Sequence, residues 1–267
     1  MMTAPIGVFD SGLGGLTVVR ALVARLPKES IIYVGDTARV PYGPKSPDTV
    51  RRYSKEIAGY LAGEGVKALV VACNTATAHA LPMLKETLSI PVVGVIEPGA
   101  RAAVRASRGG PIGVIGTVGT IASGAYERAI AEINPEITVM SAPCPLFVPL
   151  VEEGWLDTKA TKQIVKTYLK PLAATGIDTL ILGCTHYPLL AERIAKRMDG
   201  VTLIDSGAEA AIEVAMVLQQ AQIEAPPTAS PTYRFIATDA PEQFLRSARG
   251  FLGPAHTIKR VETLSVS

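Results

Sequence analysis

Cysteine, histidine and tryptophan are scarce in this chain, and neither sign of charge is in clear excess. The 267 residues include three cysteines, three histidines and one tryptophan, with 26 basic and 24 acidic side chains. Three cysteines do not make a disulfide framework and indicate free thiols in a reducing cytoplasm. The balanced charge argues against a nucleic-acid partner. No apolar run approaches the ~18 residues of a membrane span, and the N-terminus lacks a signal-peptide pattern. We therefore expect a cytoplasmic globular protein.

Short apolar runs, separated by amphipathic helical patterns, recur along the chain. They lie at residues 6–9, 31–34, 68–72, 92–96, 112–115, 179–182 and 201–204. Each run is apolar throughout, which is typical of strands buried on both faces of a parallel sheet. The clearest helix begins with Ser46 as its N-cap and Pro47 as its first residue. A proline-rich linker at 224–232 precedes a last strand at 233–238 and a last helix at 241–252. This alternation predicts an α/β fold.

Three pairs of similar segments occur in the same order and at nearly the same separation. Residues 6–12 match 112–118, residues 70–75 match 181–186, and residues 96–100 match 204–208. Each match alone is weak, because any turn from a strand to a helix tends to contain small residues. The ordered set predicts two similar lobes, each a mostly parallel sheet flanked by helices. We expect pseudo-twofold symmetry, an active site in the cleft between the lobes, and lobes at 1–97 plus 208–267 and at 98–207.

Two cysteines occupy equivalent positions in this repeat. Cys73 and Cys184 each lie just beyond an apolar strand and just before a helix, where N–H groups at the helix start lower the pKa of a thiol. Buried cysteines also serve as small apolar side chains, but the matched positions favour a paired chemical role. Cys144 has no partner in the repeat and is assigned to packing. No C-x-x-C pair is present and histidines are few, so no metal site is expected.

The turns after the first strand of each lobe contain small and hydroxyl residues. The turn from Asp10 to Thr17 resembles a dinucleotide-binding loop, but Thr17 stands where the third glycine would be. Free N–H groups at a helix start suit an anion, and Thr117 and Thr120 occupy the equivalent turn of the second lobe. A carboxylate ligand suits both turns, whereas the alternative is a pair of tight turns without a ligand.

Three further features have both a functional and a structural interpretation. The segment Pro41-Tyr42-Gly43 could wall a pocket or form a stiff turn. His186 lies two residues after Cys184, where it can orient a thiol or donate to a carboxylate. Glu152 follows a proline-rich segment and would by itself be interpreted as a solvated carboxylate.

Four motifs occur in order and span most of the chain. They read Phe9-Asp10-Ser11-Gly12-x-Gly14-Gly15, Gly35-Asp36-x4-Pro41-Tyr42-Gly43, Ala72-Cys73-Asn74-Thr75-Ala76 and Gly183-Cys184-Thr185-His186-Tyr187-Pro188. These motifs resemble the glutamate racemase family, within the cofactor-independent aspartate/glutamate racemases. The resemblance implies an isomerase that interconverts L- and D-glutamate and supplies D-glutamate for bacterial peptidoglycan. It implies that Cys73 and Cys184 transfer protons, and it places an acid at Glu152.

The resemblance also implies a set of substrate-binding residues. It assigns glutamate binding to Asp10, Ser11, Tyr42, Gly43, Asn74, Thr75, Thr185 and His186. Pro41, Thr117 and Thr120 join this set because of their places in the turns described above. Glutamate is therefore the expected partner, with no cofactor, metal, nucleic acid or membrane, and a homodimer is left open.

The chemistry of racemisation explains why two thiols are needed. One proton must leave one face of the α-carbon, and another must arrive at the opposite face. An ionised thiol takes the first proton while a neutral thiol facing it supplies the second, so the pair titrates as a unit. Asp10 and His186, one beside each thiol, are expected to tune the pair. Since no cofactor motif is present, donors already in place must stabilise the carbanion.

Three alternative functions stay open at this point. A neighbouring activity, such as that of an aspartate racemase or another cysteine-dependent isomerase, would use the same thiols. A non-enzymatic protein whose two lobes close on an amino acid would not need free cysteines at the cleft. A dinucleotide-dependent oxidoreductase is disfavoured because the first loop lacks its third glycine.

Overall fold

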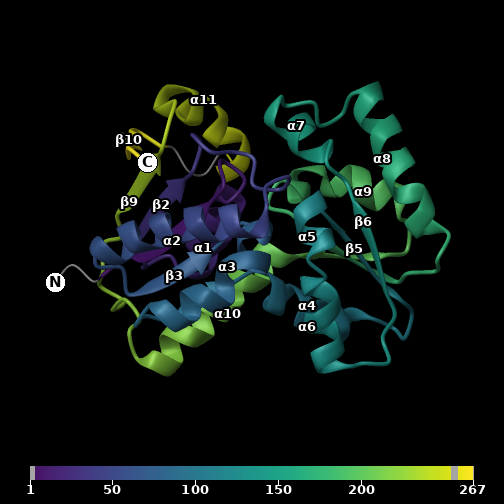
Figure 1. The fold of residues 1–267 in the computed structure, drawn as a ribbon, viewed down its shortest axis with the longest axis horizontal. Helices are drawn as coiled ribbons and strands as arrows, with labels where there is room; N and C mark the ends of the chain where they lie inside the picture. The colour runs from purple at the N-terminus through teal and green to yellow at the C-terminus, as the bar shows by residue number, and fades with distance from the viewer. Residues whose placement is uncertain (1–3, 254–257, 267) are drawn as a thin grey trace.

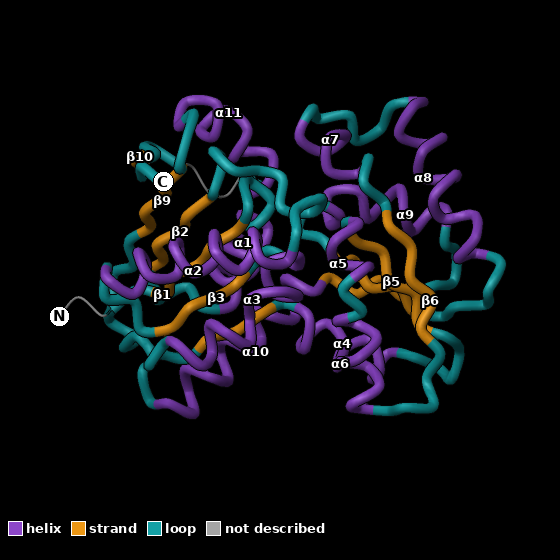
Figure 2. The backbone as a smooth tube through the Cα atoms, viewed as in Figure 1, coloured by secondary structure: helices purple, strands orange, loops and turns teal. Residues whose placement is uncertain are grey.

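Two separate parallel sheets form the framework of the protein, as Figure 1 and Figure 2 show. The computed structural model describes residues 4–253 and 258–266. The strand order is β10-β9-β2-β1-β3-β4 in the first sheet and β6-β5-β7-β8 in the second. The first sheet contains β1 (Ile6–Asp10), β2 (Ile31–Gly35), β3 (Ala68–Val71), β4 (Val92–Gly94), β9 (Tyr233–Ala237) and β10 (Glu262–Thr263). The second contains β5 (Ile112–Gly116), β6 (Val139–Pro143), β7 (Thr179–Gly183) and β8 (Thr202–Asp205).

Helices cover both faces of each sheet, which explains why the central strands are apolar throughout. In β1, Ile6 and Val8 pack with α1, α10 and α11, whereas Phe9 packs with α2 and α3 on the other face. Ser46 accepts the Thr49 N–H and caps α2, as predicted. The helices are α1 (Leu16–Arg25), α2 (Pro47–Gly63), α3 (Asn74–Thr87), α4 (Ile96–Ala106), α5 (Val118–Ala122), α6 (Ala125–Ile133), α7 (Phe147–Glu152), α8 (Lys159–Ala173), α9 (Ala191–Arg197), α10 (Ser206–Ala221) and α11 (Pro241–Leu252), with a 3-10 turn η1 (Tyr187–Leu190).

The two sheets repeat one topology. The order β2-β1-β3-β4 in the first sheet corresponds to β6-β5-β7-β8 in the second. The segments matched in the sequence lie at β1 and β5, at the ends of β3 and β7, and at the helix starts that follow β4 and β8. The predicted two-lobed α/β fold is therefore confirmed. The limits 1–97 plus 208–267 and 98–207 stay a prediction, and residues 1–3, 254–257 and 267 lie outside the described part of the chain.

Two strands were not predicted, and some predicted ends differ by one or two residues. β6 and β10 both lie at sheet edges. β6 is half-exposed and reads Val-Met-Ser-Ala-Pro, so it has no apolar run. β4 ends at Gly94 rather than at residue 96, because Ile96 already begins α4.

One helix joins the two lobes. α10 follows β8 of the second sheet and packs against α1 of the first lobe, and Figure 1 shows it beneath the first lobe. Its N-cap, Asp205, accepts the N–H groups of Gly207 and Ala208 at 2.9 and 3.2 Å. Val214 of α10, Leu16 of α1 and Leu182 of β7 belong to one buried cluster, so the apolar core runs through both lobes. Within the described residues, every helix is too short or too polar to cross a bilayer.

A buried ion pair anchors the start of the 224–232 segment. Lys67 Nζ lies 2.6 Å from Glu29 Oε2, and both side chains are less than a tenth exposed. Lys67 also donates to Ile223 O, and Glu29 Oε1 accepts the Ala225 N–H. These contacts pair the two charged groups with each other and with the start of the segment.

Replacing Lys67 should leave the Glu29 carboxylate buried without its partner. We expect Lys67→Met to lower the free energy of unfolding by about 3 kcal/mol in urea denaturation. The control is Lys85→Met, which removes the half-exposed ion pair of Lys85 with Glu97. This variant should change the free energy of unfolding by less than about 1 kcal/mol. Equal effects of the two variants would contradict the importance of the buried pair.

Candidate active site

The segments after β1, β2, β3, β5, β6 and β7 meet where the two lobes contact each other. The Thr17 hydroxyl donates to Thr185 O at 2.9 Å, and the Gly119 N–H donates to Gly43 O at 2.9 Å. These loops enclose a cavity of about 220 Å³. It is lined by Ser11, Val40, Pro41, Tyr42, Gly43, Pro44, Cys73, Asn74, Thr75, Thr117, Val118, Pro145, Val148, Pro149, Cys184, Thr185 and His186. The two matched cysteines thus line one cavity from different lobes.

Cys73 is the N-cap of α3. Its sulfur accepts the Ala76 N–H at 3.4 Å, and its S–H donates to Ser11 Oγ at 3.7 Å. Burial nevertheless raises the pKa of Cys73 to about 12, and the negative charge of Asp10 acts in the same direction. The predicted lowering of this pKa is therefore wrong, because desolvation outweighs the helix start. Cys73 is a neutral thiol at neutral pH.

Cys184 has a different environment on the opposite wall. Its sulfur lies 3.9 Å from His186 Nδ1, and His186 Nε2 lies 3.0 Å from Glu152 Oε1 at the end of α7. Burial by itself lowers the pKa of His186, but the contacts with Cys184 and Glu152 outweigh it and raise the pKa to about 10. A protonated His186 thus places a positive charge between the Cys184 sulfur and the Glu152 carboxylate.

Asp10 lies at the end of β1 beneath the cavity wall and is fully buried. Its carboxylate accepts the Gly12 N–H at 3.0 Å and the Thr185 hydroxyl at 3.4 Å. Burial raises the pKa of Asp10, more than His186 and two backbone N–H groups lower it. Asp10 thus connects the first lobe to the turn that carries Cys184.

Uncharged donors gather at one end of the cavity. The hydroxyls of Thr75, Thr117 and Thr120 lie 2.8–3.1 Å from one another. Asn74 is buried, and its Nδ2 has no acceptor among the described residues. No lysine or arginine lines the cavity. An anionic ligand in this cavity must therefore be bound by neutral groups and by the charge on His186.

The Pro41-Tyr42-Gly43 segment walls the cavity with its backbone and apolar atoms. The Tyr42 hydroxyl is buried and donates to Asp36 Oδ2, so it does not serve the cavity. Asp36 also accepts from Arg39 and from Thr238. Its carboxylate is thus fully used by the protein.

Most of the predicted site residues line the cavity, and the others lie directly behind it. Asp10, Thr120 and Glu152 contact lining residues. The sequence did not predict the wall formed by Pro145, Val148 and Pro149, since these residues carry no polar group. Cys144 is fully buried, with its sulfur 3.8 Å from Ala142 O, which fits the assignment to packing.

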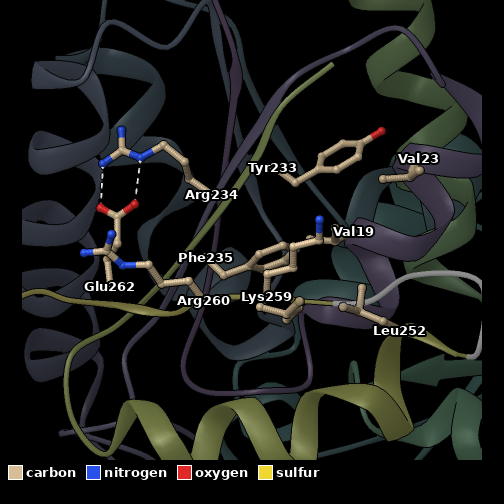
Figure 3. Close-up of a pocket in the computed structure, with 10 residues that line it drawn as sticks. Val19, Val23, Tyr233, Arg234, Phe235, Leu252, Lys259, Arg260 and Glu262 are labelled. Carbon is tan, nitrogen blue, oxygen red and sulfur yellow. Dashed lines mark hydrogen bonds and ion pairs between the residues drawn. The ribbon is translucent and has the colours of Figure 1, made fainter. Parts of the chain in front are cut away.

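Two other observations limit the choice of site. The described residues contain no group of three or more His, Cys, Asp or Glu side chains placed to hold a metal ion. Figure 3 shows a different cavity, of about 410 Å³, at the β9–β10 edge of the first sheet. There Arg234 and Glu262 bind each other through two hydrogen bonds of 3.1 and 2.8 Å. That cavity holds no cysteine, so the chemistry predicted from the sequence belongs to the cavity between the lobes.

The fold and the matched cysteines agree with one known family. A family model described as Asp/Glu/Hydantoin racemase matches residues 6–214. The chain therefore belongs to the Asp/Glu/hydantoin racemase family, a group of isomerases.

Individual relatives narrow this assignment. A glutamate racemase from Geobacter metallireducens is 53% identical over 249 residues, which are 93% of this chain and 92% of that protein. A glutamate racemase structure from Bacillus anthracis has 46% identity and a TM-score of 0.93, covering 100% of this chain and 98% of that one. The structure from Francisella tularensis, in complex with D-glutamate, has 40% identity and a TM-score of 0.92, with 98% of each chain covered. Within the family, the chain groups with the glutamate racemases, as the four motifs predicted.

Gly14 is a position where the backbone must pass close to the site. A Cβ there would lie 2.2 Å from Thr185 Oγ1 and 2.5 Å from His186 Nδ1. We expect Gly14→Ala to displace both side chains and to lower racemase kcat/KM by roughly a hundredfold. The control is Gly59→Ala at an exposed position of α2, where an added Cβ would have no heavy atom within 4 Å. It should keep full activity and gain about 0.5–1 kcal/mol of stability. Full activity in Gly14→Ala would show that this contact is unimportant.

The raised pKa of His186 makes its contribution to stability depend on pH. Its pKa is 6.5 in the unfolded chain and about 10 in the folded protein, so the contribution is complete below pH 6.5 and is lost as pH rises through 10. The difference in unfolding free energy between wild type and His186→Gln should shrink from pH 6 to pH 10. His79, whose pKa is lowered mainly by burial, is the control, and His79→Gln should show no such decrease. A constant difference for His186→Gln would mean that its folded pKa is not raised.

Proposed function

We propose that this protein interconverts L- and D-glutamate by proton transfer between two thiols on opposite faces of the substrate. The observation that carries the proposal is the placement of Cys73 and Cys184, from equivalent turns of two lobes, on one cavity. Relatives over nearly the full length are glutamate racemases, and one of them was solved with D-glutamate. This agreement supports glutamate as the substrate.

The two sulfurs exchange roles during the reaction. In one direction the Cys184 thiolate removes the α-proton, and the electrons of the C–H bond stay on the α-carbon and spread into the α-carboxylate. The Cys73 thiol then delivers its proton to the opposite face. The products are the other enantiomer, a Cys184 thiol and a Cys73 thiolate, so the enzyme is ready for the reverse reaction. The total charge of the site does not change.

The neighbours of each sulfur explain how the two states alternate. On the Cys184 side, protonated His186, held by Glu152, stabilises the thiolate. On the Cys73 side, the hydroxyl of Ser11 and the N–H of Ala76 are the donors available to a thiolate. Asp10 lies behind the cavity wall, where its carboxylate accepts the Thr185 hydroxyl and its negative charge favours the substrate ammonium group in the cavity.

The substrate carboxylates are bound by neutral donors in this proposal. Asn74 Nδ2 is a buried donor without an acceptor in the described part of the chain. The hydroxyls of Thr75, Thr117 and Thr120 bind one another. Ser11, Gly43 and Thr185 complete the set. These donors are already in position when charge develops on the carboxylate, so they stabilise the carbanion without rearrangement.

We also propose that the reaction needs neither a metal nor an organic cofactor. No lysine lines the cavity, whereas pyridoxal phosphate enzymes hold their cofactor as a lysine Schiff base. We assign the product, D-glutamate, to peptidoglycan synthesis and the enzyme to the cytoplasm. Glutamate is the proposed partner, without nucleic acid, and a homodimer is left open.

Serine variants of the three cysteines test the mechanism. Protein dialysed against a chelator, without pyridoxal phosphate, should convert either enantiomer of glutamate to the racemate in a circular dichroism assay. Cys73→Ser and Cys184→Ser should each lower kcat by roughly 10³-fold, because a hydroxyl is a far weaker acid than a thiol. The double variant should be no worse than either single one. Cys144→Ser, the matched control, should stay near wild type.

Three results would contradict the proposal. They are substantial racemisation by folded Cys184→Ser, loss of activity in folded Cys144→Ser, and turnover of aspartate in preference to glutamate.

A further inference from the structure

Tyr126 lies between the two turns that carry the cysteines. It is the second residue of α6 in the second lobe and is 1% exposed. Its ring occupies space left by two glycines, since a Cβ on Gly183 or Gly99 would lie 3.0 or 3.6 Å from a ring carbon. Gly183 directly precedes Cys184, so the ring packs against one catalytic turn.

The Tyr126 hydroxyl reaches the other catalytic turn. It donates to Asn74 Oδ1 at 2.7 Å, in a buried bond between residues of different lobes. Asn74 directly follows Cys73 and lines the cavity. Burial raises the pKa of Tyr126 further above its ordinary value. The hydroxyl therefore keeps its proton at neutral pH and acts as a hydrogen-bond donor.

This hydrogen bond selects one orientation of the Asn74 amide. An amide presents an acceptor at one end and donors at the other. Because Tyr126 binds Oδ1, the donor Nδ2 is the end left for a ligand, and it is buried without an acceptor among the described residues. If the amide turned over, its oxygen would face a substrate carboxylate, and no lysine or arginine of the cavity could compensate.

We propose that Tyr126 is a positioning residue that holds the Asn74 amide with its NH₂ group toward a carboxylate of the substrate. Tyr126 belongs to the second lobe, and it holds in place a donor, the Asn74 amide, that belongs to the first lobe. The identity of the ligand, glutamate, rests on the proposed function above, whereas the orientation of Asn74 rests on the Tyr126 bond alone.

The test combines Tyr126→Phe with Asn74→Ala. Tyr126→Phe removes one oxygen and leaves the ring in place. It should raise KM for both enantiomers, and the Kd for glutamate in calorimetry, by about tenfold, the effect of one hydrogen bond. The kcat should stay within about twofold. Asn74→Ala should raise KM at least as much, and adding Tyr126→Phe to it should have no further effect, since both changes remove the same donor.

A matched control separates positioning from simple loss of a buried hydrogen bond. The Tyr187 hydroxyl, also buried, donates to Cys144 O at 2.8 Å. Tyr187→Phe should lower the melting temperature without changing KM. An unchanged KM in Tyr126→Phe, or KM effects of Tyr126→Phe and Asn74→Ala that multiply in the double variant, would overturn the proposal.

Calorimetry keeps this test independent of the proposed function. If the wild type binds glutamate without racemising it, the proposed function fails, and the Kd values of the variants still decide the role of Tyr126. If the wild type racemises glutamate and Tyr126→Phe binds it normally, only the inference on Tyr126 fails.

Discussion

The constraint on which the site depends is the burial of two sulfurs on one small cavity, where an unpaired charge is costly. Burial raises the pKa of Cys73 to about 12, and a second thiolate in the same small volume would be repelled by the first. The protein therefore surrounds the sulfurs unequally. Protonated His186 lies beside Cys184, and the Asp10 carboxylate lies near Cys73. A duplicated fold thus supplies two matching cysteines with unequal neighbours.

The sequence predicts most of the fold because its central strands are buried on both faces. Apolar runs such as Ile6–Phe9 identify such strands directly. β6 is an edge strand with polar and half-exposed residues, so its own composition does not reveal it. The repeat offers a second route to it, because β6 is the counterpart of β2 in the common strand order. A topology argument thus succeeds where local hydrophobicity does not.

The sequence predicts the candidate site best where polar residues follow apolar strands. Cys73, Asn74, Cys184 and His186 were found in this way, and the structure brings them to one cavity. Tyr126 could not be found, because it lies on an ordinary amphipathic helix, 52 positions from Asn74. The raised pKa of Cys73 could not be predicted either, since it depends on how much water the other lobe excludes. Local sequence patterns therefore predict the residues of each lobe but not the contacts between the lobes.

The order of the strands has a consequence for how the chain is made. β9 pairs with β2 in the first sheet, yet residues 233–237 leave the ribosome after the whole second lobe. Until then β2, already paired with β1, presents an open edge of unpaired backbone groups in the nascent chain. Such an edge can pair with another chain. The second sheet, by contrast, is built from the continuous stretch between Ile112 and Asp205 and can close during synthesis. The lobe that begins first is thus the one completed last.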